Sequence, residues 1–243
     1  MKSYHYYIRK THRYLGLFIG IQFLLWTLGG LFFSWTNIDR IHGDHLVNRK
    51  VSPAPFPDRL FPLDKILDEN RIPHHFIQSV ALMPLHSGWY YQLIRKDTPI
   101  VRYFDAQNGM MLPPMDKKEA LQLTAMHYRY DYPPDKVKYI TEENKDEHLD
   151  YRGGALPAWG IHYSAPEDVW LYYSARHHRL EKVRTGRWRL FDFLWMLHIM
   201  DFDERDNINN SLLRVFSILG LLTILSGFAL FFVSSRTIRR WRV

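Results

Sequence analysis

The chain has 243 residues, of which 47% are hydrophobic and 16% are aromatic, a composition that excludes an intrinsically disordered protein. It carries 32 Lys and Arg against 25 Asp and Glu, a net charge of +7, and it has no cysteine. The sequence therefore excludes disulfides, thiolate nucleophiles, iron–sulfur clusters and covalent haem attachment through C-x-x-C-H.

Two segments of the chain are apolar and free of charge. Residues 14–35 and 215–235 are each long enough for a helix that crosses the hydrocarbon core, which takes about 20 apolar residues. Buried helices of soluble proteins seldom run this far without a polar face, and the first segment is too long for a cleaved signal peptide. We expect transmembrane helices over residues 14–35 and 211–235. Glycines in both, among them Gly16, Gly20 and Gly220, suit close packing of the two helices.

Charged residues are distributed unevenly around these spans. The tails, residues 1–13 and 236–243, contain basic residues and no acid, whereas residues 36–186 carry as many acids as bases. Basic flanks stay in the cytoplasm under the positive-inside rule. Both termini are therefore expected in the cytoplasm and the central domain outside it. Because the tails account for the basic charge, no basic patch remains for nucleic acid, and we exclude that partner.

The central domain, residues 36–186, shows a similar order of elements twice. A helical pattern and two strand-like runs end in a turn at Asn108-Gly109, which favours a positive φ. The second copy opens with a helix for which Asp116 is the expected N-cap, and Glu119 three residues later nearly completes a capping box. The expected helices cover residues 62–70 and 116–128, and the expected strands 88–95, 100–105, 136–141, 158–164 and 169–174. This predicts an α+β fold of two modules, about 62–112 and 116–184, each an antiparallel sheet against a helix.

Residues 187–210 connect the central domain to the second span. Residues 187–202 (RWRLFDFLWMLHIMDF) are strongly aromatic, with charges interspersed. Such a mixed pattern suits a helix that lies in the headgroup region of a membrane. We expect an interfacial helix and a loop here.

Three motifs resemble the family of PepSY proteins with associated transmembrane helices. They are a basic-His-Arg entry to the first span (residues 9–17, RKTHRYLGL), the segment around His198 (residues 195–202, WMLHIMDF), and a strand and turn (residues 103–109, YFDAQNG). The resemblance implies PepSY-like modules in the periplasm and anchoring in a bacterial inner membrane. Larger relatives have four membrane helices, whereas two are expected here.

The resemblance implies binding of a protein partner, either a peptidase or a membrane complex, in a setting that includes iron uptake. We expect no catalytic residues, because the sequence has no H-E-x-x-H, no G-x-S-x-G and no phosphate loop. The exposed part of the aromatic residues in the central domain would form the binding surface. A homo-oligomer is compatible with this function.

The alternative is a haem-b electron-transfer subunit, as in the ferric-chelate reductases that some relatives resemble. Haem b requires facing imidazoles, and neither apolar run contains a histidine. At the outer margin His198 with His42 or His45 would supply two ligands, whereas His12 at the inner margin would need a second chain. The competing interpretation is that these histidines lie at the membrane interface without a ligand. The adjacent pairs His74-His75 and His177-His178 are poor joint metal ligands and are expected on the surface, so we predict no metal site.

Overall fold

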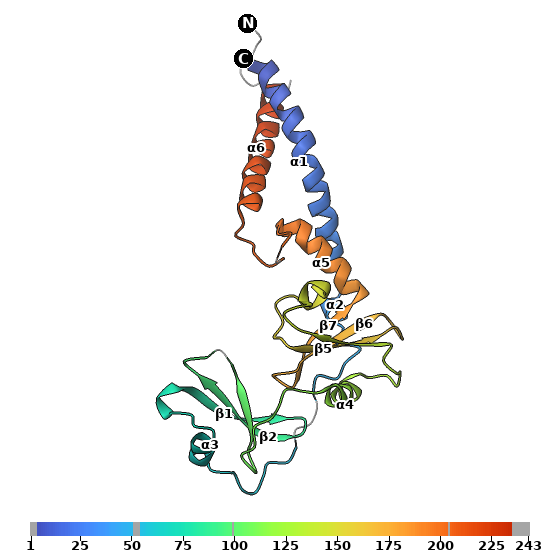
Figure 1. Cartoon of the computed structure of the whole chain (residues 1–243). Coiled ribbons are helices and arrows are strands. Elements are labelled where there is room, and N and C mark those ends of the chain that lie inside the picture. Colours follow the sequence, from blue (N-terminus) through green and yellow to red (C-terminus); the bar gives the residue numbers. More distant parts are fainter. Residues whose placement is uncertain (1–3, 51–53, 99, 204, 235–243) are drawn as a thin grey trace. The chain divides into compact units, whose positions relative to one another are not determined.

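Helices α1 (Tyr4–Trp35) and α6 (Ser211–Ser234) lie side by side in the computed structural model of the protein (Figure 1). The structure describes residues 4–50, 54–98, 100–203 and 205–234, so the predicted tail 236–243 lies outside the described residues. The chain divides into two units, Met1–Asn37 with Leu190–Val243, and Ile38–Arg189. We call the second unit the ectodomain, after the location outside the cytoplasm that the sequence predicts for it.

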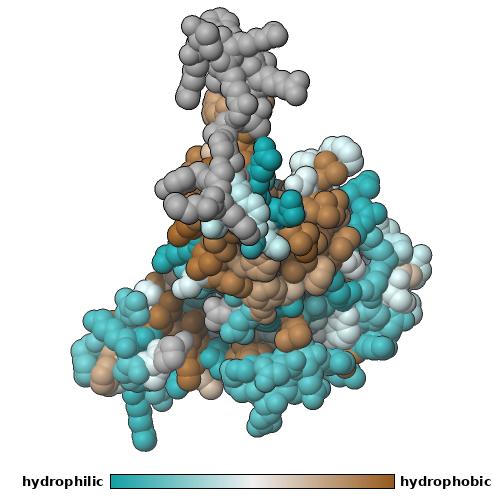
Figure 2. Space-filling view, turned by 90° about the horizontal axis from the view of Figure 1, so that it is seen from above, coloured by the Kyte–Doolittle hydropathy of each residue, from teal (hydrophilic) through white to brown (hydrophobic). Residues whose placement is uncertain are grey.

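Helices α1 and α6 are both long enough and apolar enough to cross a membrane. Helix α1 contains the whole predicted span 14–35, ends with it at Trp35, and extends towards the N-terminus as far as Tyr4. The basic segment before the apolar run contains no Gly or Pro, so nothing in it ends the helix. Large apolar side chains are exposed along both helices, and apolar surface gathers in the middle of the view in Figure 2.

The two helices pack closely, as expected, but not through the G-x-x-x-G of the first. A Cβ atom placed on Gly16 or Gly20 would meet nothing within 4 Å. The close approach comes from α6, where a Cβ on Gly220 would lie 2.9 Å from the ring of Phe23. The small residues of α6 thus accept large side chains of α1.

Helix α5 (Gly186–Ile199) is shorter at its C-terminal end than the predicted span to residue 202. Phe191 packs on Phe33 of α1, with ring centroids 4.9 Å apart. After α5 the chain turns, and Asn210 begins α6: its Oδ1 accepts from the Leu213 amide at 2.8 Å, a normal N-cap bond.

The first module of the ectodomain is a three-stranded antiparallel sheet with one helix. Strands β1 (Ile77–Leu85), β2 (Gly88–Arg95) and β3 (Arg102–Asp105) pair in that order, and α3 (Leu63–Glu69) contributes to their core. The core residues are Ile66, Leu67, Ile72, Leu93 and Phe104. The turn after β3 has the predicted positive φ at Gly109, where a Cβ would overlap the ring of Phe61 at 2.6 Å.

The second module is a four-stranded antiparallel sheet. Strands β4 (Lys136–Ile140), β5 (Ala158–Tyr163), β6 (Val169–Ser174) and β7 (Arg179–Thr185) pair in chain order. Helix α4 (Lys117–His127) contributes Ala120 and Leu123 to the core of this sheet, which includes Ile161, Leu171 and Tyr173. The predicted cap is confirmed, because Asp116 Oδ1 accepts from the Glu119 amide at 2.7 Å.

The chain enters and leaves the ectodomain beside β7. The short helix α2 (Ile38–His42) contacts this strand, and Gly43 follows with a φ of 73°. A Cβ on Gly43 would lie 2.7 Å from a methyl group of Val183. Thr185 donates through its hydroxyl to the carbonyl of Ile41 at 3.4 Å. Glycine at position 43 therefore lets α2 approach the last strand.

The predicted α+β class, with antiparallel sheets between two apolar helices, is confirmed. Three short 3-10 helices, His74–Phe76, Lys145–Glu147 and Leu149–Tyr151, were not expected. Strands β1 and β7 were not expected either. β1 lacks regular alternation and contains Pro84, and β7 is rich in charged residues, which are depleted in strands in general.

Candidate functional site

His12 lies on α1 against the small residues of α6. Its Nδ1 is 2.8 Å from the hydroxyl of Ser226, and a Cβ on Gly227 would lie 3.2 Å from its ring. The hydroxyl of Ser226 donates to the carbonyl of Thr223 at 2.8 Å, so towards His12 it accepts. Nδ1 of His12 therefore donates to Ser226, and in the neutral ring Nε2 is the unprotonated nitrogen, the form that binds metals.

His198 lies on α5 in a group of aromatic rings. Trp26, Phe33 and Trp195 have ring centroids 5.8, 5.9 and 6.2 Å from its own. The Nδ1 of His198 and the Nε1 of Trp26 are buried, and in the described part of the chain neither has a hydrogen-bond partner. Burying these two polar atoms without hydrogen-bond partners costs free energy of desolvation. A ligand that forms hydrogen bonds with them, or a metal bond with His198, would recover that cost.

His42 and His45 follow the first span and belong to the ectodomain. The side chain of His42 is exposed at the end of α2. His45 forms a short ion pair through Nε2 with Glu167, which occupies the nitrogen that a haem iron would use most readily.

Along α1, His12 is separated from the ring of Trp26 beside His198 by 14 residues, which is about 21 Å of helix. His12 and His198 therefore do not form one site. Among the described residues, no group of three His, Cys, Asp or Glu side chains could hold a metal ion. Among the described side chains, His12 and His198 are thus single imidazoles at two separate levels of the helix pair.

A different histidine cluster joins the two modules of the ectodomain. Glu119 on α4 accepts at Oε1 from Nδ1 of His178 at 2.8 Å, and the same oxygen lies 3.3 Å from Nε2 of His86. His178 lies in the β6–β7 turn and His86 in the β1–β2 turn. The cluster therefore connects the hairpin of the first module to the helix and a turn of the second.

Both ring nitrogens of His178 face acceptors. Nδ1 lies against the Glu119 carboxylate and Nε2 is 3.0 Å from the carbonyl of Pro113. A neutral imidazole has one donor and one acceptor, so both contacts are hydrogen bonds at the same time only in a doubly protonated ring. His178 is 3% exposed and has a φ of 50°, so the prediction that this residue lies on the surface is wrong. The pair His74-His75 is exposed as predicted.

The contacts of the cluster lower the pKa of the Glu119 carboxyl group. Burial raises the pKa of Glu119, but hydrogen bonds from His178 and His86 outweigh it and lower that pKa to about 2. Burial lowers the pKa of the neighbouring His127, whose Nδ1 donates to the carbonyl of Leu123 at 2.9 Å. At neutral pH Glu119 is therefore a carboxylate, and burial favours the neutral form of His127 beside it.

No pattern in the sequence indicates this cluster. Glu119 was recognised only as part of a helix cap, and the capping role of its backbone is confirmed, but its carboxylate bonds to histidines far away in the chain. His86 stands next to Ser87 and Gly88, which indicates a turn and nothing about a partner.

Strand β1 is an edge strand of the first sheet, and in the part of the chain that the structure describes no further strand pairs with its outer side. β1 pairs with β2 only, and its sequence, IQSVALMPL, contains no charged residue. The other edges are protected: β3 is bridged by Met111, β4 carries Lys136 and Lys138, and β7 contacts α2. A long uncharged edge can pair with a strand of another polypeptide.

No family model, curated protein or solved structure matched the chain.

Proposed function

We propose that the chain is a two-pass membrane protein whose ectodomain binds an extended segment of a partner protein along strand β1. The open, uncharged edge of β1 carries this proposal. Its backbone groups offer the hydrogen bonds of a further strand, and side chains on alternate positions add selectivity. Natural sheets protect such edges with charges, as this chain does at β4. On β1 only Pro84 and the irregular pairing at Ile77 and Ser79 interrupt the edge, so the uncharged stretch between them is free to pair.

The PepSY resemblance supports a peptidase or a membrane complex in iron uptake as the partner. Both are polypeptides that offer extended segments. The charge of the tails supports cytoplasmic termini and a periplasmic ectodomain at a bacterial inner membrane.

A photo-crosslinking amino acid at position 81 tests the binding surface in living cells. Ala81 is exposed on β1, so the probe leaves the core intact. We expect a covalent adduct with one polypeptide, and we expect that the added charges of a Ser79→Lys/Leu82→Lys variant abolish it. An adduct that persists in this variant, or no adduct at all, would refute strand addition.

The matched control places the same charges on α4. Gln122 and Met126 are exposed on that helix, away from β1, and lysine is compatible with a helix. The Gln122→Lys/Met126→Lys variant should keep the adduct at position 81. Equal loss in both variants would mean that net charge, and not the β1 edge, controls binding.

The orientation has its own test. A reporter that is active only after export, fused after residue 110 between the two modules, should be active. Activity of a cytoplasm-only reporter at the same position would contradict a periplasmic ectodomain.

A haem-b electron-transfer subunit is the second candidate, favoured by the unprotonated Nε2 of His12 and the partnerless Nδ1 of His198. Haem b would supply electron transfer when bound. The fit is partial, since the described side chains place one imidazole at each of these two levels, and two facing ligands would require a second copy. His12 is already oriented by Ser226, as metal-binding histidines commonly are.

An absorption spectrum of protein from haem-replete cells separates the two candidates. A Soret band that is lost on His198→Ala or His12→Ala would support the haem-b subunit. Colourless protein would contradict the haem-b subunit and leave the partner-binding protein as the function.

A further inference from the structure

A pocket of about 310 Å³ opens where the two modules of the ectodomain meet. Its apolar lining comes from three elements: Pro84 and Leu85 at the end of β1, Leu123 on α4, and Leu180 on β7. The volume is at the lower end for small-molecule sites, so the pocket suits one amino-acid residue rather than a long segment.

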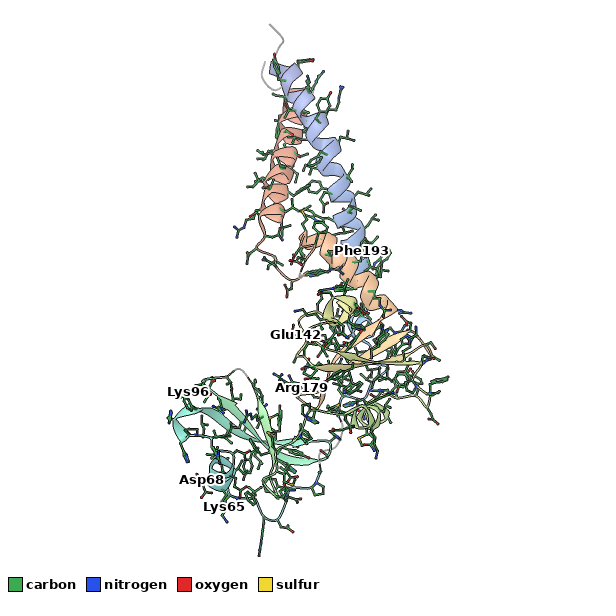
Figure 3. All side chains as sticks on the ribbon, in the orientation of Figure 1. Lys65, Asp68, Lys96, Glu142, Arg179 and Phe193 are labelled. Atoms are coloured by element: carbon green, nitrogen blue, oxygen red, sulfur yellow. The ribbon has the colours of Figure 1, made fainter. Side chains whose placement is uncertain are left out.

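Two guanidinium groups line the same pocket. Arg49 and Arg179 have side chains that are 46% and 61% exposed, and Figure 3 labels Arg179. Arg49 donates through Nε to Asp44 at 2.9 Å, and Arg179 lies 3.8 Å from Glu181, beyond hydrogen-bond distance. The guanidinium groups keep further N–H donors in a planar arrangement that matches a carboxylate.

The third contribution is a buried nitrogen. The side chain of His86 is 9% exposed, its Nε2 lies 3.3 Å from Oε1 of Glu119, and its Nδ1 is buried without a hydrogen-bond partner among the described residues. In the tautomer that carries its proton on Nε2, the lone pair on Nδ1 is an acceptor for an N–H group. A buried acceptor without a donor indicates a missing partner.

We propose that this pocket binds the C-terminal residue of a polypeptide. The carboxylate lies between Arg49 and Arg179, the amide N–H of the residue donates to Nδ1 of His86, and an apolar side chain packs on the leucines. This rests on strand addition to β1 and specifies which end of the partner is bound. A segment that pairs with β1 in the parallel direction has its C-terminus at Leu85, the end of β1 that lines the pocket.

N-acetyl-leucine is the smallest probe with all three features, and ligand-observed NMR with the full-length protein in detergent micelles measures its binding. We expect saturable binding at millimolar concentration, and binding at least about tenfold weaker for N-acetyl-leucinamide, which lacks the carboxylate. Acetate, which has the carboxylate alone, should also bind at least about tenfold more weakly. Equal binding of the amide would refute the carboxylate site, and equal binding of acetate would refute recognition of a peptide terminus.

Two single variants and a control locate the site. Arg49→Gln and Arg179→Gln remove exposed charges, so the fold is retained, and each should weaken N-acetyl-leucine about tenfold. Arg59→Gln removes an exposed arginine outside the pocket and should leave the affinity unchanged. Unchanged binding in both pocket variants would overturn the assignment.

The test separates this inference from the proposed function. The Ser79→Lys/Leu82→Lys variant should lose the adduct at position 81 but still bind N-acetyl-leucine. If N-acetyl-leucine fails to bind while the wild-type adduct forms, the pocket is refuted and strand addition stands. If the probe binds and no adduct forms, the pocket is retained and strand addition is refuted.

Discussion

Glu119 and His178 form an ion pair, 2.8 Å between Oε1 and Nδ1, that joins α4 to the turn before β7. His178 is almost completely buried, and the glutamate is a quarter exposed. Since His86 of the first module approaches the same oxygen, this pair also lies at the contact between the two modules.

Acid should weaken the ectodomain through Glu119. Its pKa is lowered from 4.5 to about 2 in the folded protein, so the stabilisation is complete above about pH 4.5 and is lost as the pH falls towards 2. Allowing for partial exposure, we expect a loss of about 2 kcal/mol. Urea unfolding followed by near-ultraviolet circular dichroism measures it. A Glu119→Gln variant should lack this part of the pH dependence, and an unchanged profile would contradict the role of the pair.

Removing the imidazole of His178 should destabilise the ectodomain more than removing the imidazole of His177. His178→Ala leaves the Glu119 charge without its main partner and places alanine at a positive φ, with an expected loss of about 3 kcal/mol of ectodomain stability. His177→Ala is the control, because His177 is half-buried and only its backbone amide, not its ring, is seen to form a hydrogen bond. Similar unfolding midpoints for the two variants would refute the assignment.

Gly109 should tolerate no side chain. Gly109→Ala combines a positive φ with overlap of the Phe61 ring, and we expect a loss of about 3 kcal/mol. Gly153 also has a positive φ, but a Cβ there meets nothing within 4 Å, so Gly153→Ala should lose about 1 kcal/mol. Urea unfolding of both variants measures the two losses of stability. Their difference is the cost of the overlap between the new Cβ and the ring of Phe61. Equal losses would mean that Phe61 moves aside.

The helix pair should depend on Gly220 and not on Gly20. The chain has no cysteine, so Phe18→Cys and Phe216→Cys, which replace rings 5.6 Å apart, give an unambiguous disulfide between α1 and α6. Adding Gly220→Leu should reduce the yield of this disulfide several-fold, because the leucine meets Phe23.

The control for the helix pair is Gly20→Leu. A Cβ at this position meets nothing within 4 Å, so the disulfide yield should stay at the level of the double-cysteine protein. A larger effect of Gly20→Leu than of Gly220→Leu would show that the helices pack through the G-x-x-x-G of α1 after all.

The sequence predicted those features that depend on neighbouring residues. The apolar runs, the Asp116 cap and the turn at Gly109 are local patterns with one dominant physical cause each. Strand β1 escaped prediction, because its positions do not alternate regularly between exposed and buried, and Pro84 is uncommon within a strand.

The histidine cluster could not be predicted, because it is a product of tertiary packing. His86, Glu119 and His178 are distant in the chain and meet only when the β1–β2 turn reaches α4. A pattern of adjacent histidines predicted surface positions, which holds for His74 and His75 but not for His178, whose ring is held by two acceptors.

The contact between α2 and β7 has a mechanical consequence. Thr185 and Ile41 hold together the two points at which the chain enters and leaves the ectodomain. A pulling force between these points acts first on this contact and does not pass through the inner strands of either sheet. Under tension the two tethers would have to separate at Gly43 and Val183 before any sheet is loaded.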